Sequence, residues 1–299
     1  MRFLVLLIGV LAVLPAAAQN AKEDYETLKK FYRNQAKQLD FYLDREGKEK
    51  LKLQPPVMTW TGLDYQGYRD TQAPNSGDVF VWTYKGRAIV AGGVLSLPLD
   101  SGHEVYQEFQ ALVETPPQPI YSPCKWGPTW APTGVELRLL EVAVKPSAGS
   151  DPAALRQRDI QMRGLAKQFT AETKSATSGE IQQLKLLPKA VFRLNSTELQ
   201  QADSSVVDGC LFIFTNQLGT DPELTLLLEC HQTDDGLRWM YAPGSLAFQE
   251  LWLKHKGKEV WHLPNFLELP GERNFVSTLL YRNIGIDEMK QIADQELKP

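Results

Sequence analysis

Three carboxylates lie close together in the second half of the chain, and paired carboxylates are the groups that hydrolyse glycosidic bonds. Asp208, Asp221 and Glu223 flank the apolar segment 209–215 and the turn that follows it. One such acid can protonate a leaving group while the other activates water or attacks the sugar. The same residues also suit turns, because 219–223 reads Gly-Thr-Asp-Pro-Glu and Asp208 precedes a glycine. The residue types therefore leave a hydrolytic site and a pair of polar turns both open.

His103 and Glu104 form a second candidate, as a general base or a metal ligand near Asp100. A polar turn between two strands explains the same residues. None of the four histidines has the spacing of a zincin helix, and no two cysteines have zinc-ligand spacing. A glycine-rich phosphate loop and a nucleophilic serine elbow are also missing from the sequence. We therefore predict no metal, no cofactor and no catalytic residue.

Trp126 and Trp130 flank Gly-Pro-Thr inside a proline-rich segment. Tryptophans on a stiff loop can form a stacking platform for sugars or peptides. They can equally cover one end of a sheet as an apolar plug. Both residues are therefore candidates for binding, with the plug as the alternative.

Positioning these residues requires helices and strands that the apolar spacing predicts. Apolar residues at spacings of three and four predict a helix over 25–42, and Asp151-Pro152 begins a second helix as N-cap and first helical residue. Phe80 and Trp82, like Phe212 and Phe214, alternate with residues that are also apolar. Such runs predict strands buried on both faces, and the short connections between them favour antiparallel pairing.

Several segments recur at a nearly constant offset. Residues 77–83 (Gly-Asp-Val-Phe-Val-Trp-Thr) resemble 209–215 (Gly-Cys-Leu-Phe-Ile-Phe-Thr), and Leu-Lys-Leu recurs at 51–53 and 184–186. This order of matches predicts an internal duplication. The predicted fold is therefore α+β, with two tandem units of one helix and an antiparallel sheet.

These patterns divide the chain into five segments: a signal peptide (1–18), a first α+β unit (19–114), a proline-rich connector with a closing strand (115–150), a second α+β unit (151–270) and a C-terminal extension with a short helix (271–299). The connector carries six prolines between residues 115 and 132, which removes backbone donors and prevents regular pairing.

The N-terminus has the layout of a secretory signal. Arg2 precedes an apolar run over 3–13, and Ala16-Ala17-Ala18 provides small residues for cleavage after Ala18. An uncleaved anchor is the alternative, but the run is shorter than the ~20 residues that span a bilayer. No later segment is long and apolar enough to span one. The sequence thus predicts a secreted or periplasmic protein without a membrane span after cleavage.

Composition argues against nucleic acid as a partner. The net charge is −4 at pH 7, and acidic and basic residues are well mixed, with no basic stripe. Cys124, Cys210 and Cys230 are too few for a disulfide scaffold. Cys210 and Cys230 either face each other across a hairpin as a disulfide or remain two buried free thiols.

Residues 208–214, 219–223, 239–242 and 258–261 follow one another in an order that resembles a group of exported proteins of planctomycete-type bacteria. Further matching segments extend the resemblance over most of the chain after residue 18; they are 77–87, 133–138, 163–169 and 184–188. The chain departs from the group's usual Asp-Gly-Ala at Cys210. The resemblance implies export, bacterial origin and an α+β fold, and it implies no activity, since none is established for the group.

Three functions follow as hypotheses. The first is a non-enzymatic exported binding or envelope-associated protein that recognises a glycan, a peptide or an envelope protein. The second is a hydrolase of unrecognised type that uses the carboxylates of the 208–223 hairpin or His103 and Glu104. The third is a purely structural envelope component.

Overall fold

The computed structural model describes residues 16–44, 46–62, 75–114, 130, 132–175, 178–202, 205–217, 219–265 and 274–295, with side chains from residue 24 onward. Most of the predicted signal peptide lies outside this range, as do residues 115–129 and 131 of the proline-rich connector, among them Cys124 and Trp126. Antiparallel strands dominate the described residues, with only four helices among them. Every pairing between strands of the described residues is antiparallel, which confirms the expectation from the short connections.

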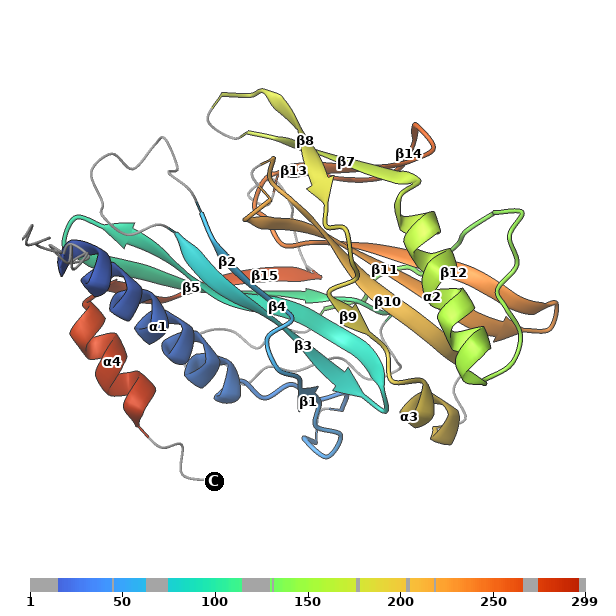
Figure 1. Cartoon of the computed structure of the whole chain (residues 1–299), viewed down its shortest axis with the longest axis horizontal. Coiled ribbons are helices and arrows are strands. Elements are labelled where there is room, and N and C mark those ends of the chain that lie inside the picture. Colours follow the sequence, from blue (N-terminus) through green and yellow to red (C-terminus); the bar gives the residue numbers. More distant parts are fainter. Residues whose placement is uncertain are drawn as a thin grey trace, which may run out of the picture.

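The first sheet has six strands in the order β1-β3-β4-β5-β15, and β2 also pairs with β3. Its strands are β1 (Lys52–Leu53), β2 (Met58–Thr61), β3 (Ser76–Tyr84), β4 (Arg87–Leu99), β5 (Gly102–Ala111) and β15 (Phe275–Ile284). Helices α1 (Ala16–Lys37) and α4 (Ile286–Asp294) lie side by side against this sheet (Figure 1). Phe31 and Tyr32 of α1 pack there with Met289 of α4.

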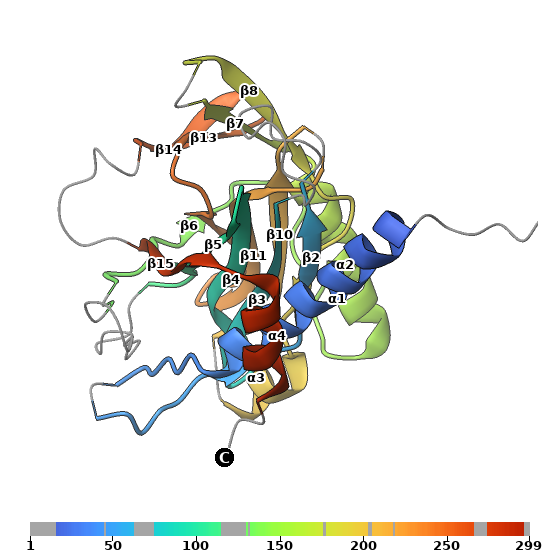
Figure 2. The same cartoon turned by 90° about the vertical axis from the view of Figure 1, so that its left-hand side faces the viewer.

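The second sheet has nine strands in the order β14-β13-β7-β8-β10-β11-β12-β6, and β9 also pairs with β10. Its strands are β6 (Arg138–Leu139), β7 (Phe169–Lys174), β8 (Ile181–Leu186), β9 (Phe192–Arg193), β10 (Val206–Thr215), β11 (Pro222–Thr233), β12 (Gly236–Ser245), β13 (Glu250–His255) and β14 (Lys258–Leu263). One of the two sheets curves into a half-barrel. Strands β7, β8, β13 and β14 lie together at one end of the molecule in both views (Figures 1 and 2).

Two helices accompany the second sheet, α2 (Pro152–Ala166) and the short α3 (Ser196–Gln201). Asp151 caps α2 as predicted, because its side chain accepts hydrogen bonds from the amides of Ala153 and Ala154. Met162 and Leu165 of α2 pack against the second sheet. The helix ends at Ala166, and Phe169 begins β7.

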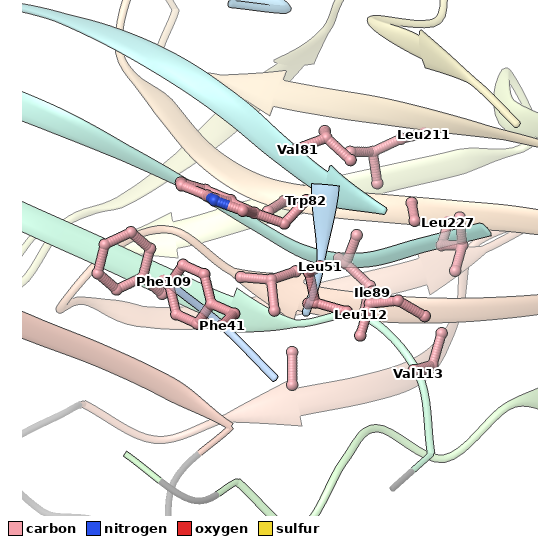
Figure 3. Packing of buried hydrophobic residues seen from close by; sticks show 14 of the residues in the cluster. Phe41, Leu51, Val81, Trp82, Ile89, Phe109, Leu112, Val113, Leu211 and Leu227 are labelled. Carbon is pink, nitrogen blue, oxygen red and sulfur yellow. The ribbon is translucent and has the colours of Figure 1, made fainter. Parts of the chain in front are cut away.

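The two sheets pack face to face through apolar side chains. Val81 of β3 points toward Leu211 of β10 in the core between them (Figure 3). Successive strand residues point to opposite faces, so Trp82 turns the other way and packs edge-on against Phe41 and Phe109. The central strands are therefore buried on both faces, which confirms the prediction from their continuous apolar runs.

The predicted fold class, two tandem helix-plus-sheet units, was wrong. The protein is mostly antiparallel β-structure in two unequal sheets. β15, from the predicted C-terminal extension, pairs with β5 in the first sheet, and β6, from the predicted connector, pairs with β12 in the second. The matched segments 77–83 and 209–215 lie in β3 and β10, and two antiparallel strands follow each of them, β4 and β5 or β11 and β12. The outer strands differ, because the first sheet ends on β15, whereas the second ends on β6 and continues on its other side through β7, β13 and β14. The pattern of apolar residues in a strand predicts that the strand is buried, but it does not predict which other strands pair with it.

The core between the sheets provides a direct test of this arrangement. We expect Leu211→Ala to lower the free energy of unfolding by about 2–5 kcal/mol, because it removes buried methyl groups and leaves a cavity. Leu139→Ala is a matched control, since Leu139 is 49% exposed on β6 and its loss should change stability by about 0.5 kcal/mol or less. Urea denaturation measures both values. Equal losses in the two variants would contradict the face-to-face packing.

Candidate functional site

A cavity of about 450 Å³ lies where residues of the two sheets face each other. Its walls combine apolar and aromatic side chains with three carboxyls and three amides. The lining residues are Trp60, Asn75, Leu95, Leu97, Tyr106, Glu108, Asp221, Pro222, Glu223, Leu246, Ala247, Phe248, Gln249 and Asn265. A concave, mainly apolar space of this size with a few convergent polar groups is typical of a small-molecule site.

The first sheet forms one wall through a row of residues in register. Trp60 pairs with Gly77, Gly77 with Leu95, and Leu95 with Tyr106 across β2, β3, β4 and β5. Paired residues in antiparallel strands lie on the same face. A Cβ at Gly77 would come within 2.9 Å of the Trp60 Nε1 atom, so the missing side chain makes room for the indole. Glycine at this position therefore allows an aromatic ring to lie flat in the wall.

Glu108 lies on the same face of β5 as Tyr106, two residues further along. Its neighbours in register are Gly93 on β4 and Ser277 on β15, and these small residues leave space around the carboxyl. The Ser277 hydroxyl donates to Glu108 Oε1 at 3.2 Å. Burial, together with the negative charge of Asp221, raises the pKa of Glu108 to about 8.

The second sheet forms the opposite wall through the turn that leads into β11. The Asn216 amide donates to the Asp221 carbonyl at 2.9 Å, and Gly219 in this turn has φ of 80°. A turn is present as predicted but spans residues 216–221, and β11 begins at Pro222. Asp221 at the end of the turn and Glu223 in the strand both line the cavity.

Contacts between β5, β11 and the segment after β12 hold this wall in place. The Leu246 amide donates to the Glu223 carbonyl at 2.8 Å. The Ser245 amide donates to Gln110 Oε1 of β5 at 2.9 Å. A Cβ at Gly244 would come within 2.6 Å of both Gln110 and Thr225, so only glycine allows this close approach of the sheets. Segment 245–249 is therefore fixed between β5 and β11.

The three carboxyls influence one another and meet no cation among the described lining residues. Burial raises the pKa of Glu223 well above its usual value, and the charges of Asp221 and Glu108 raise it further. Burial also raises the pKa of Asp221. The described residues that line the cavity include no Lys, Arg or His. Such a site can accept a positive charge or exchange protons, whereas an anion would meet electrostatic repulsion.

Asp208 lies away from this cavity. It is fully buried at the start of β10, where Arg158 Nε donates to Asp208 Oδ2 at 2.8 Å and Arg193 Nη2 donates to the same oxygen at 2.7 Å. Arg158 is itself 1% exposed on α2. The structure therefore brings together only two of the three hairpin carboxylates that the sequence singled out, and it places Asp208 in a paired, structural position.

His103 and Glu104 do not act as a pair, because adjacent strand residues point to opposite faces of β5. Burial lowers the pKa of His103, and its Nδ1 atom has no hydrogen-bond partner among the described residues. Glu104 accepts a hydrogen bond from the Tyr106 hydroxyl at 2.8 Å. Glu104 thus touches the cavity only through a lining residue.

The remaining candidates lie in the core or outside the described residues. Trp130 is 8% exposed and packs edge-on against Phe41, with ring centroids 5.9 Å apart, as expected of a plug. Cys210 and Cys230 are free and buried, which confirms the free-thiol interpretation.

No sequence argument assigned Trp60 or Glu108 to a site. A charged residue between the apolar positions Val105, Phe109 and Ala111 was the signal for Glu108.

No family model, curated protein sequence or solved structure matches this chain. The resemblance to exported planctomycete-type proteins therefore stays a prediction. Among the described residues, no helix is long and apolar enough to cross a membrane. Within the same residues, no three His, Cys, Asp or Glu side chains converge in a way that would hold a metal ion.

The raised pKa of Glu108 predicts how stability varies with pH. Its pKa is about 8 when folded, against an ordinary value of 4.5, so folding disfavours its ionised form. This destabilisation is absent below about pH 4.5, grows as the pH rises and is complete above about pH 8. We expect Glu108→Gln to stabilise the protein by about 1 kcal/mol or more at pH 8 and to have little effect at pH 4.5.

Urea denaturation of both proteins at the two pH values measures this difference. Glu172→Gln is the control of opposite sign, because hydrogen bonds from Lys254 lower the pKa of Glu172. That variant should lose stability at pH 8. A loss of stability in Glu108→Gln at pH 8 would show that its carboxylate is favourably paired in the folded protein.

Proposed function

We propose that this chain is an exported small-molecule-binding protein and that its ligand occupies the cavity between the two sheets. One observation carries the proposal. Glu108 and Glu223, each 8% exposed, line a cavity of about 450 Å³ whose other walls are mainly apolar and aromatic. Burying carboxyls without a cation is unfavourable, and such groups cluster at functional sites.

Export rests on the signal sequence over residues 1–18 and on the resemblance to exported proteins. Neither a glycan polymer nor a large peptide is favoured by this cavity, because its volume suits a compact ligand. The proposal therefore narrows the expected partner from an envelope polymer or protein to a small molecule.

A hydrolase is the second candidate, and the neighbouring carboxyls Asp221 and Glu223 favour it. An acid with a raised pKa next to a second carboxyl is what glycoside hydrolysis requires. Apart from the three carboxyls and three amides, the described lining is mainly apolar and aromatic, which suits a compact apolar body better than a hydroxyl-rich sugar ring, so binding is the better supported function.

Filling the cavity should abolish binding without harming the fold. We expect N-phenylnaphthylamine, a neutral apolar probe that fluoresces in dry pockets, to bind the native protein. Leu97→Trp places a larger ring in the wall and should weaken this binding at least about tenfold. Leu99→Trp is the matched control, since Leu99 lies on the same face of β4 beyond the cavity. If fluorescence titration gives the same probe affinity for both variants, the probe binds outside this cavity.

Turnover assays separate the two candidates. We expect the purified protein to release no reducing sugar from soluble glycans at pH 5 to pH 8, because the site is proposed to bind and not to cleave. Released sugar that disappears in Glu223→Gln but persists in the distant variant Glu172→Gln would favour the hydrolase instead.

A further inference from the structure

The buried acidic side chains of the described residues fall into two groups. Asp78, Asp208 and Glu229 each have an arginine within 3.3 Å, supplied by Arg33, by Arg158 and Arg193, and by Arg87. Glu108 and Glu223, the other two, both line the cavity and have no basic partner. Wherever this fold buries an acid outside the cavity, it also supplies the matching cation.

Glu223 shows most clearly that the acids of the cavity have no basic partner among the described residues. Its side chain is 8% exposed, and no hydrogen bond or ion pair to its carboxyl is present among the described residues. Ser277 gives Glu108 one hydrogen bond, which leaves its charge uncompensated. A buried carboxyl of this kind is stabilised by a donor that carries positive charge.

We propose that the ligand of this cavity is a protonated organic amine, whose ammonium group sits among Glu108, Asp221 and Glu223 and whose apolar body lies against Trp60, Tyr106 and Phe248. This inference rests on the proposed function, and it adds the chemical class of the ligand. The volume of about 450 Å³ accommodates an ammonium with an aromatic or alkyl body.

The aromatic wall fits the same ligand class. Trp60 and Tyr106 belong to one register row of the first sheet, and Phe248 lines the same cavity from the segment after β12. Aromatic faces attract ammonium groups and also bury alkyl and aryl carbon. An inorganic cation would use the carboxyls alone and would leave these rings exposed to water.

Amine binding should exchange a proton for the ammonium. In the empty cavity part of the carboxyls are protonated, because burial disfavours their charge. The amine enters as R-NH₃⁺, a carboxylic acid releases its proton to solvent, and an ammonium–carboxylate pair remains, so the charge of the site is conserved.

The titratable groups that face this exchange come from two elements. Tyr106 and Glu108 belong to β5, Glu223 belongs to β11, and Asp221 immediately precedes β11. β2, β4 and segment 246–249 contribute no titratable lining residue. Glu104 contacts Tyr106 from outside the cavity, with Arg282 at 3.8 Å from Glu104. Carboxyls therefore account for the proton released near neutral pH.

Isothermal titration calorimetry with matched ligands tests this ligand class on the full mature protein. A panel of primary amines (phenylethylamine, tryptamine, hexylamine, spermidine) is compared with the corresponding alcohols and with phenylpropionate. We expect at least one amine to bind about 30-fold or more tightly than its alcohol, and the carboxylate not to bind. Amine affinity should rise between pH 5.5 and pH 8, and the binding enthalpy should vary with the ionisation enthalpy of the buffer, because protons are released.

Variants locate the amine. Glu223→Gln should weaken amine binding about 30-fold or more and weaken N-phenylnaphthylamine binding far less, because the probe is neutral, whereas Glu172→Gln should alter neither. Thermal melting checks that both variants fold. If alcohols bind as well as amines while the probe still binds, the amine inference fails and the binding function stands. If neither the amines nor the probe binds, both fail.

Discussion

The apolar contact between the two sheets is the interaction on which the rest of the structure depends. Val81 on β3 meets Leu211 on β10, and this packing brings β5 opposite the start of β11. Gly244 lets the sheets approach closely, and Gln110 then bonds the Ser245 amide. The cavity walls are therefore anchored to two packed sheets, with Glu108 and Glu223 on strands and Asp221 in the turn that enters β11.

The cavity is maintained at some expense of stability. Two buried carboxyls with raised pKa values oppose folding at neutral pH, in contrast to the paired Asp208. A well-packed apolar residue at either position would be more favourable for folding alone. Where a buried residue lowers stability in a fold whose other residues support it, a binding or catalytic role is the usual physical reason.

The sequence predicted local features well and the assembly poorly. Strand burial, antiparallel pairing, the Asp151 cap and the turn at Gly219 all follow from periodicity and turn chemistry over a few residues. The assembly of the strands into sheets could not be predicted in this way, because β15 and β6 pair with strands that are distant in sequence, β5 and β12. Asp221 and Glu223 were found as a local pair. Glu108 could not be added to them, since only the packing of the sheets brings β5 to that hairpin.

Asp208 and Glu223 show why residue type alone does not identify a site. Both are buried carboxylates of the same hairpin, and both fit the same catalytic or turn interpretation in sequence. They face opposite sides of the second sheet, so Asp208 meets two arginines and Glu223 meets a cavity. The presence of a partner, and not burial or charge, separates a structural carboxylate from one that awaits a ligand. By that criterion, the carboxyls of the cavity, which have no basic partner among the described residues, favour a positively charged ligand.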